Sequence, residues 1–462
     1  MKDFDIIHNA QKEFFISKKT FPISYRINSL KRLKSNIIKY EDEIFKSLKD
    51  DLGKSKSETY FSEISLLYNE INLALKNIRK WSSKKRVSSS LINFISSDYI
   101  LPEPYGITLN ISPWNYPFQL AISPIIGAVS AGNTVVLKPS EYTQKTSCLL
   151  KKIINKSFDK RHVEVILGGP EVGSYLLNLK WDYIFFTGST KIGKIVAKKA
   201  AMYLTPTTLE LGGKNPCIID KNVNLKVAVK RIVWGKFLNC GQTCIAPDFI
   251  LCNKFKKEEF IKQVIERIKH VYGLDPSKSI NYSKIINSSH INRLDNLISD
   301  EKVLFGGKFN LKKRFFEPTI VEVKNPNNKI LKEEIFGPVL PIIEYESESE
   351  LYKILNNFKN PLAFYVFTNR IKFGEKLMKD FSFGGGAVND TIGQIINHRL
   401  PFGGIGNSGH GKYHGKESFN TFSHFKPYII KSRFFDINFK YKVDEKSLTF
   451  RIMKKIFRNI SI

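Results

Sequence analysis

The first 80 residues place apolar and charged positions with the period of an amphipathic helix. In "SYRINSLKRLKSNIIKYEDEIFKSLKDDLG", residues 24–53, apolar residues recur three and four positions apart, and charged residues fill the intervals. Gly53 closes this pattern, and glycine commonly ends a helix. Residues 61–81, "FSEISLLYNEINLALKNIRKW", continue in the same style. We therefore predict a mostly helical N-terminal segment.

From residue 100 the pattern changes to short β-branched runs separated by stretches of helix length. Each run ends in glycine, proline or serine: "YGITLNIS" (105–112), "NTVVLKPS" (133–140), "VEVILGG" (163–169) and "DYIFFTGS" (182–189). Strands that alternate with helices predict βαβ units and a parallel sheet, so the fold class is α/β. Ligands bind such sheets at the carboxyl ends of the strands, where these polar turns lie.

A second α/β region follows "LELGGKNPCIID", residues 209–220. It contains a long helical pattern at 256–273 and short apolar runs at 340–345 and 363–369. A glycine-rich stretch then leads to "PFGGIGNSGHGKYHGKESFNTFSHFK", residues 401–426. The chain has 462 residues, with neither an internal repeat nor a low-complexity linker, and we expect two domains or more.

Composition narrows the class of protein. With 42% hydrophobic and 25% charged residues, the chain is typical of a soluble globular protein. The N-terminus has early acidic residues and no continuous apolar segment, so we expect no signal peptide, and no apolar run predicts a spanning helix. A net charge of +30 would favour nucleic acid or anionic lipid. However, the lysines are scattered and no nucleic-acid-binding motif accompanies them, so we expect no nucleic-acid partner.

The five cysteines are sparse and form no CxxC pair. This usage argues against a disulfide framework or a structural zinc site, and it fits a reducing cytoplasm. Cys148, Cys217 and Cys252 stand in apolar or helical runs, where we expect inert core residues. Cys240 and Cys244 are different, because both lie in the polar, turn-rich stretch "LNCGQTCIAPD" at residues 238–248.

Cys244 is the best candidate for a nucleophile. Small or polar residues precede it and a proline follows shortly after, which indicates a turn rather than a packed core. A catalytic thiolate needs access, a lowered pKa and a group that stabilises the oxyanion it creates. Cys240 lies about one helical turn away, and we leave open whether it oxidises together with Cys244.

Two strand ends could bind a nucleotide. In "YIFFTGSTKIG", an apolar run meets Gly188 and Ser189, and Gly193 follows at the start of a helical pattern. A helix N-terminus after such a turn attracts a pyrophosphate, although a plain βα turn has the same residues. In "VVLKPSE", Lys138 and Glu141 could hold ribose hydroxyls, or they could lie in a solvated loop.

The order of the motifs carries a family resemblance. "PWNYP", "KPSE", "FTGSTKIG", "LELGGKNP", "GQTCIAPD", "EEIFGPVLP", "AVND" and "PFGGIGNSGHGKYHG" follow one another across some 300 residues. This order resembles the aldehyde dehydrogenase superfamily, and the ending with the modest length is most similar to its class 3 branch, the fatty and aromatic aldehyde dehydrogenases. The resemblance implies oxidation of an aldehyde to a carboxylic acid with NAD or NADP.

The resemblance also implies a role for individual residues. Cys244 matches the nucleophile, Glu210 the general base and Asn115 the amide of the oxyanion hole. The implied cofactor contacts are Lys138 and Glu141 (adenosine ribose), Gly188, Ser189 and Gly193 (pyrophosphate), Leu211 and Phe336 (nicotinamide), and Glu334 (nicotinamide ribose).

The local chemistry is consistent with these roles. Thiolate attack on an aldehyde gives a thiohemiacetal with a negative oxygen, which an amide donor such as Asn115 and the Cys244 N–H would stabilise. A carboxylate at Glu210 could then activate water to hydrolyse the thioester. The apolar residues before Glu210 suggest partial burial, which would raise its pKa. The alternative acceptor is coenzyme A instead of water.

The resemblance finally implies a division of the chain. We expect a Rossmann-like NAD(P)-binding domain from residues 1–84 and 106–208, and an α/β catalytic domain from 209–390. Residues 85–105 and 400–430 are expected to form a β-arm that makes a homodimer. The tail, 431–462, has apolar positions at helical spacing with basic residues between them. We expect it to pack on the partner subunit or near the substrate entrance, with contact to an anionic membrane as the alternative.

Overall fold

Helices fill the first 81 residues, as the apolar spacing predicts. The computed structural model describes residues 2–90, 93, 96–325, 328–436, 441 and 445–459. The first elements are α1 (Lys2–Ile16), α2 (Ile23–Lys39), α3 (Glu41–Leu52), α4 (Lys56–Thr59), the π-helical turn η1 (Tyr60–Ile64) and α5 (Ser65–Trp81). The pattern at 24–53 spans two helices that meet at Tyr40, and Gly53 ends the second in the left-handed conformation, with φ of 70°.

Each of the four predicted apolar runs contains a strand of one parallel sheet. These are β3 (Ile107–Ile111), β4 (Thr134–Lys138), β5 (Val163–Val165) and β6 (Tyr183–Thr187), and β7 (Thr207–Glu210) extends the sheet. The strand order is β17-β7-β6-β3-β4-β5, and β17 (Gly409–His410) is antiparallel to β7. The intervening helices are α6 (Gln119–Ala131), α7 (Gln144–Ser157), α8 (Pro170–Leu176) and α9 (Thr190–Ala201). The predicted α/β class is confirmed.

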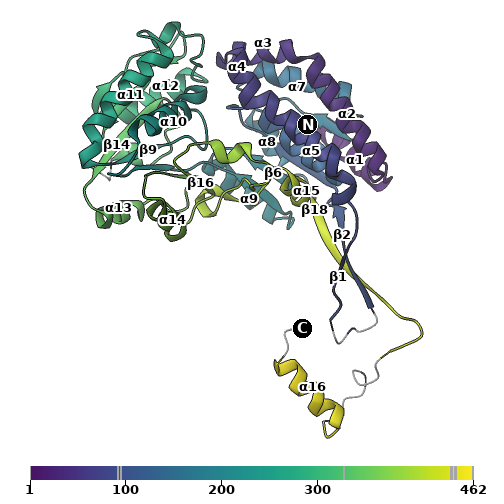
Figure 1. Cartoon of the computed structure of the whole chain (residues 1–462). Coiled ribbons are helices and arrows are strands. Elements are labelled where there is room, and N and C mark those ends of the chain that lie inside the picture. Colours follow the sequence, from purple (N-terminus) through teal and green to yellow (C-terminus); the bar gives the residue numbers. More distant parts are fainter. Residues whose placement is uncertain are drawn as a thin grey trace.

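A second sheet forms the other lobe in Figure 1, with the order β10-β13-β14-β9-β8-β15-β16. Its strands are β8 (Pro216–Ile219), β9 (Phe249–Asn253), β10 (Lys302–Phe305), β13 (Thr319–Glu322), β14 (Val339–Tyr345), β15 (Ala363–Phe367) and β16 (Gly385–Val388). All neighbours run parallel except β10 and β13. The helices of this lobe are α10 (Leu225–Phe237), α11 (Lys257–Tyr272), α12 (Ser288–Ile298), α13 (Glu348–Leu355) and α14 (Ile371–Asp380). A short hairpin joins β11 (Phe309–Asn310) to β12 (Phe315–Phe316).

A narrow antiparallel arm projects from the first lobe (Figure 1). It consists of β1 (Lys85–Val87), β2 (Ser96–Pro104) and β18 (Ser423–Lys431), in the order β1-β2-β18. The short helix α15 (Lys416–Thr421) leads into β18, and α16 (Leu448–Asn459) lies beyond the arm, away from both lobes in this view. Within 400–430, therefore, Gly409–His410 joins the first sheet and Ser423–Lys431 joins the arm, while the limits of the domains stay a prediction.

The cysteines are not all where the sequence analysis places them. Cys217 and Cys252 are buried in the second lobe, as expected, but Cys148 is exposed. It lies on α7, whose buried side includes its immediate neighbours Leu149 and Leu150. The prediction of an inert core residue at Cys148 was wrong, because an apolar neighbourhood in the sequence does not say which side of the helix a residue occupies.

Candidate active site

Cys244 follows a tight turn after α10. The 3-10 turn η3 (Leu238–Gly241) contains two consecutive left-handed residues, Asn239 with φ of 52° and Cys240 with φ of 55°. Such a conformation costs free energy in residues other than glycine and persists where the surroundings hold it. Here the Gln242 side chain donates to the carbonyl oxygens of Asn239 and Lys284, at 3.1 and 3.0 Å, and accepts from the Ile286 N–H.

The Cys244 thiol lies within the influence of two carboxylates. Its side chain is half-buried, and burial followed by the nearby charges of Glu334 and Glu210 raises the pKa of the thiol, while the backbone N–H groups of Cys244 and Ile245 lower it. The lowered pKa that a resting thiolate needs is therefore not found. The thiol has to lose its proton as the reaction begins, and a base must be within reach.

Glu210 lies at the carboxyl end of β7. Its side chain is buried, and both carboxylate oxygens have no hydrogen-bond partner among the residues that the structure describes. Burial alone raises the pKa of this carboxyl well above its usual range, the direction that the apolar flank predicts. An unpaired, buried carboxyl group near a thiol is a strong candidate for a base with a pKa closer to neutrality.

Asn115 is held against the Cys244 loop. The side-chain nitrogen of this buried residue donates one hydrogen to the carbonyl oxygen of Gln242 at 3.0 Å, which leaves its second hydrogen for another acceptor. The next residue, Tyr116, shares a hydrogen bond of 2.6 Å with the hydroxyl of Thr243. Two consecutive residues thus contact the two residues that precede the thiol.

Glu334 and Phe336 come from the loop before β14. A Cβ atom added to Gly212 would lie 2.0 Å from Glu334 Oε2, so any larger residue at this place would displace the carboxylate. Burial and the charge of Asp248 raise the pKa of Glu334 to about 8, and the Gly213 N–H opposes the shift. Phe336 has φ of 48°, and its ring meets the Trp114 ring edge-on at 5.3 Å.

The phosphate-type turn is tied to Glu210. The Gly188 N–H donates to the Glu210 carbonyl oxygen at 3.0 Å, and Ser189 caps α9 by accepting from the Ile192 N–H. A Cβ atom added to Gly193 would lie 2.6 Å from Leu211 Cδ2, so glycine lets α9 approach this residue. The N–H groups of the first turn of α9 therefore lie close to the edge that carries Glu210 and Leu211.

Lys138 and Glu141 form an ion pair with each other. Their charged atoms are 2.8 Å apart at the end of β4, with the lysine mostly buried and the glutamate more exposed. The structure thus brings a cation and an acceptor together near the strand ends, on the same edge of the sheet as the α9 turn. These groups fit the ribose of a dinucleotide, and the α9 N-terminus fits its pyrophosphate.

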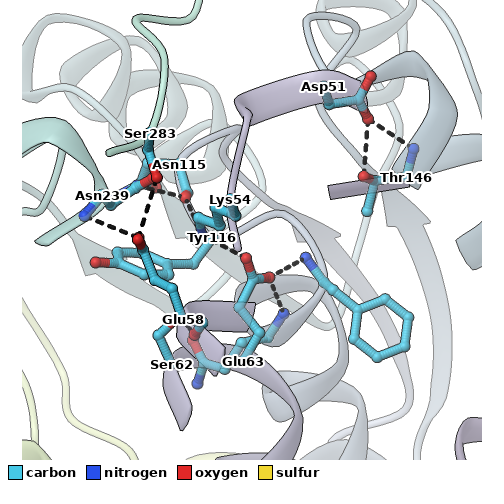
Figure 2. A network of polar contacts seen from close by, with 12 residues as sticks. Asp51, Lys54, Glu58, Ser62, Glu63, Asn115, Tyr116, Thr146, Asn239 and Ser283 are labelled. Atoms are coloured by element: carbon cyan, nitrogen blue, oxygen red, sulfur yellow. Dashed lines mark hydrogen bonds and ion pairs between the residues drawn. The ribbon is translucent and has the colours of Figure 1, made fainter. Parts of the chain in front are cut away.

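Several residues at the site were missed by the sequence analysis. Asn215 donates to the carbonyl oxygens of Cys244 and Ala246, at 2.7 and 3.0 Å, and so fixes the backbone on both sides of Ile245. Lys54, from the loop between α3 and α4, and Glu58, from α4, reach the same region (Figure 2). The "GGKNP" stretch could have drawn attention to Asn215, whereas no local pattern distinguishes Lys54 from the many other lysines. The described residues contain no cluster of the kind that holds a metal ion.

Cys240 is not placed as a partner of Cys244. It is buried, and burial raises the pKa of its thiol to about 12, while a side-chain hydrogen bond with Tyr282 lowers it. Because the thiolate is the form that oxidants attack, this environment gives no support to joint oxidation with Cys244.

A half-buried thiol, an amide donor and an unpaired carboxylate meet at the carboxyl edge of a nucleotide-type sheet. This arrangement indicates an α/β oxidoreductase with a dinucleotide-binding fold and a candidate cysteine nucleophile. Residues 2–427 match the model of the aldehyde dehydrogenase family. The chain belongs to this family.

Individual relatives agree over most of their length. The chain is 44% identical to the 4,4'-diaponeurosporen-aldehyde dehydrogenase of Staphylococcus aureus, covering 91% of this chain and 92% of the relative. It is 42% identical to the dimeric, NADP-preferring aldehyde dehydrogenase of Mus musculus, covering 94% and 95%. The solved substrate-bound structure of Staphylococcus aureus AldH superposes with a TM-score of 0.95 at 41% identity, covering 98% and 99%. The protein is an NAD(P)-dependent aldehyde dehydrogenase that resembles the class 3 branch.

Proposed function

We propose that Cys244 attacks the aldehyde carbon and that Asn115 helps to hold the resulting oxyanion. The support is geometric: the Asn115 amide is held by Gln242, two residues before the thiol, with one hydrogen left to donate, and the Cys244 N–H lies at the thiol. Donors that are fixed before the reaction stabilise developing charge most effectively, and the loss of one typically costs about 2.7–4 kcal/mol. Collapse of the thiohemiacetal leaves a thioester on the sulfur.

Glu210 has two tasks in this proposal, to accept the thiol proton and to activate the water that hydrolyses the thioester. The lack of a hydrogen-bond partner among described residues and the raised pKa favour both tasks, because the carboxylate has no competing donor. Coenzyme A as the acceptor is the second candidate. Product analysis with and without coenzyme A separates the two, and formation of an acyl-coenzyme A would contradict hydrolysis.

The cofactor is NAD or NADP, and when bound it accepts the hydride of the thiohemiacetal. In our proposal the first turn of α9, with Gly188, Ser189 and Gly193, binds the pyrophosphate. Lys138 and Glu141 bind the adenosine ribose, Glu334 the nicotinamide ribose, and Leu211 and Phe336 the nicotinamide. The Lys138–Glu141 pair leaves the choice between NAD and NADP open, since the lysine favours a 2′-phosphate and the glutamate opposes it.

The proposed substrate is an apolar aldehyde, of medium to long aliphatic chain or aromatic. Thr391 Oγ1 donates to the Arg231 carbonyl on α10, and the Ile392 N–H reaches Tyr365, whose hydroxyl donates to the Ile245 carbonyl. The 391–396 segment is thus tied to the residue after the thiol. Trp234 and Ile396, on α10 and in this segment, expose 47% and 62% of their surfaces, which supports an apolar approach to the sulfur.

The observation that carries the proposal is the convergence of Cys244, Glu210 and Asn115 from three separate elements. The test is NAD(P)H formation over a panel of aliphatic and aromatic aldehydes, with each cofactor in turn. We expect activity that rises with apolar surface and disappears in Cys244→Ala, while Cys148→Ala, which removes an exposed cysteine, stays active. Activity retained in Cys244→Ala would refute the assignment.

A homodimer in the cytoplasm is the proposed setting. The Mus musculus relative is named dimeric, and the arm presents β18 as an edge strand. The five cysteines are free, which fits a reducing compartment. No described helix has the length and apolar character needed to cross a membrane. We place the tail against the partner subunit, because the apolar side chains of α16 remain partly exposed within one chain.

A further inference from the structure

Lys54 is a buried lysine that contacts the segment carrying Asn115 (Figure 2). The Lys54 ammonium nitrogen is 2.5 Å from Glu63 Oε1 and 3.0 Å from the Asn115 carbonyl oxygen. It also lies 4.0 Å from the centre of the Tyr116 ring. Both charged side chains are completely buried, which is costly unless each is paired and hydrogen-bonded. This fully buried ion pair, which contacts the Asn115 segment, is therefore a candidate for a functional role.

The residues that Lys54 contacts are hydrogen-bonded in turn to the residues that precede Cys244. The Asn115 carbonyl oxygen that accepts from Lys54 also accepts from the Asn239 side chain at 2.7 Å. The Asn115 amide is bound to Gln242, and the Tyr116 hydroxyl to Thr243. One ammonium group therefore contacts two consecutive residues, and each of these contacts the turn that ends in the thiol.

Glu63 fixes the same segment at its other end. Its Oε2 accepts from the N–H groups of Phe118 and Gln119, at 2.9 and 3.2 Å, where α6 begins. Glu63 belongs to the π-helical turn η1, and π-turns are rare and frequent at functional sites. The Lys54–Glu63 ion pair thus contacts the backbone at both ends of the segment from Asn115 to Gln119.

Glu58, which precedes Glu63 in the chain, contacts the turn before Cys244. Its Oε1 accepts from the Asn239 N–H at 2.9 Å, and its Oε2 accepts from the Ser283 hydroxyl at 3.2 Å. Asn239 is the first of the two left-handed residues of the turn. In Figure 2, the α4–η1 segment faces both the Asn115 segment and the Asn239 turn.

We propose that Lys54 is a positioning residue of the oxyanion site, with Glu63 as its charge partner. Through the Asn115 carbonyl and the Tyr116 ring, Lys54 sets the direction in which the Asn115 amide points relative to the Cys244 sulfur. The ammonium group touches neither substrate nor sulfur and transfers no proton. This inference rests on the role proposed above for Asn115.

The variants must remove the contact without leaving a buried charge. Lys54→Met alone would strand Glu63, which is strongly destabilising. Lys54→Met/Glu63→Gln removes both charges, keeps similar side-chain lengths, and leaves an amide oxygen to accept from Phe118 and Gln119. Lys54→Gln/Glu63→Gln returns a donor toward the Asn115 carbonyl and is the conservative variant. Lys56→Met is the control, since Lys56 is exposed and two residues away.

The test is a double-mutant cycle with Asn115→Ala. In the parent, the Met/Gln pair should lower kcat about tenfold or more, because a misplacement of about 1 Å can cost 10²-fold. In Asn115→Ala the same pair should lower kcat less than about twofold, since the two changes act through one group. We expect partial recovery of kcat in the Gln/Gln pair, an unchanged KM for NAD(P), and an unchanged rate of Cys244 alkylation by iodoacetamide.

Equal losses in both backgrounds, or no loss in the parent, would overturn the inference. Melting curves check that each variant folds. If the Met/Gln pair does not fold, the Gln/Gln pair replaces it in the cycle. The Gln/Gln pair should then lower kcat in the parent but not in Asn115→Ala. Asn115→Ala by itself tests the proposed function separately, with an expected loss in kcat of about 10²–10³. Full activity of Asn115→Ala refutes the role of Asn115 and, with it, that of Lys54.

Discussion

The Glu210 carboxylate ends β7 without a hydrogen-bond partner in the described part of the chain, and the Cys244 thiol lies near it with a raised pKa. Both groups are therefore biased toward their neutral forms by burial. The burial that raises both pKa values makes the Glu210 carboxylate a stronger base than an exposed one and the Cys244 thiol a weaker acid than an exposed one. We therefore propose that the sulfur loses its proton only as the attack begins, rather than resting as a thiolate.

Glu210→Gln tests this pairing. Since the carboxylate form is the proposed base, parent kcat should rise as pH rises through the raised pKa of Glu210, and this limb should vanish in the variant. Steady-state kcat should fall about 10²- to 10⁴-fold. Because Glu210 is proposed to serve both steps, rapid-quench and stopped-flow measurements of NAD(P)H should show a slowed first turnover, followed by a still slower steady state.

The control is Glu333→Gln, because Glu333 is exposed and pairs with Arg293 at the surface. Loss of the first turnover in Glu210→Gln would assign Glu210 mainly to the thiol proton. A retained pH limb would contradict its role as the base altogether.

At the scale of elements, glycine positions decide how closely the loops approach one another. Gly212 follows β7 and stands directly beside Glu334 from the loop before β14, so the two sheets meet at this contact. Gly241 is held in the left-handed region with the Gly337 carbonyl oxygen 2.2 Å from the place of a Cβ. Both contacts lie beside the thiol turn. A larger residue at Gly212 would displace the Glu334 side chain, whereas one at Gly241 would require a backbone shift.

Gly212→Ala should therefore impair cofactor binding. The added methyl group would displace Glu334, and we expect KM for NAD(P) to rise about tenfold, as for the loss of one interaction of about 1.4 kcal/mol. Because the charge of Glu334 also raises the pKa of the Cys244 thiol, its displacement should not slow alkylation of Cys244 by iodoacetamide. Gly173→Ala on α8 is the matched control, since nothing lies within 4 Å of its added Cβ. An unchanged KM in Gly212→Ala would exclude Glu334 as a cofactor contact.

The elements and the contacts between them differ in how well the sequence predicts them. Periodicity and turn residues are local signals, so the helices to residue 81, the parallel sheets and the α9 turn follow from them. Lys54 meets Asn115 across 61 residues, and Glu58 meets Asn239 across 181. No local pattern encodes such pairs. The outward direction of Cys148 and the raised pKa of Cys244 were missed because both depend on packing in three dimensions.

At the scale of the whole molecule, the arm is the feature that favours association with a second subunit. Strand β18 pairs with β2 alone among the described strands, so it is an edge strand of the arm. Phe425, Ile429 and Ile430 on this strand each expose more than 40% of their surface. An edge of this length with exposed apolar side chains suits pairing with a second copy, which agrees with the proposed homodimer.

Ile429→Lys/Ile430→Lys should shift the protein from dimer to monomer in sedimentation velocity. Two charges on a facing edge strand repel their symmetry mates and remain poorly hydrated in the interface. Ile371→Lys on α14, an isoleucine of similar exposure, is the control. Removal of residues 445–462 should weaken the dimer to a smaller degree, because the tail is proposed to pack on the partner. A variant that stays dimeric would move the interface away from β18.

The late return of the chain to its first sheet has a consequence for synthesis on the ribosome. Gly409–His410 forms the edge strand beside β7, and a Cβ at Gly409 would lie 1.8 Å from the Leu209 carbonyl, one residue before Glu210. Any nascent or truncated polypeptide that stops before residue 409 lacks this strand beside Glu210, the proposed general base. We therefore expect only nearly complete chains to form the full site around Cys244. Shorter translation products contain Cys244 but lack part of the structure around it.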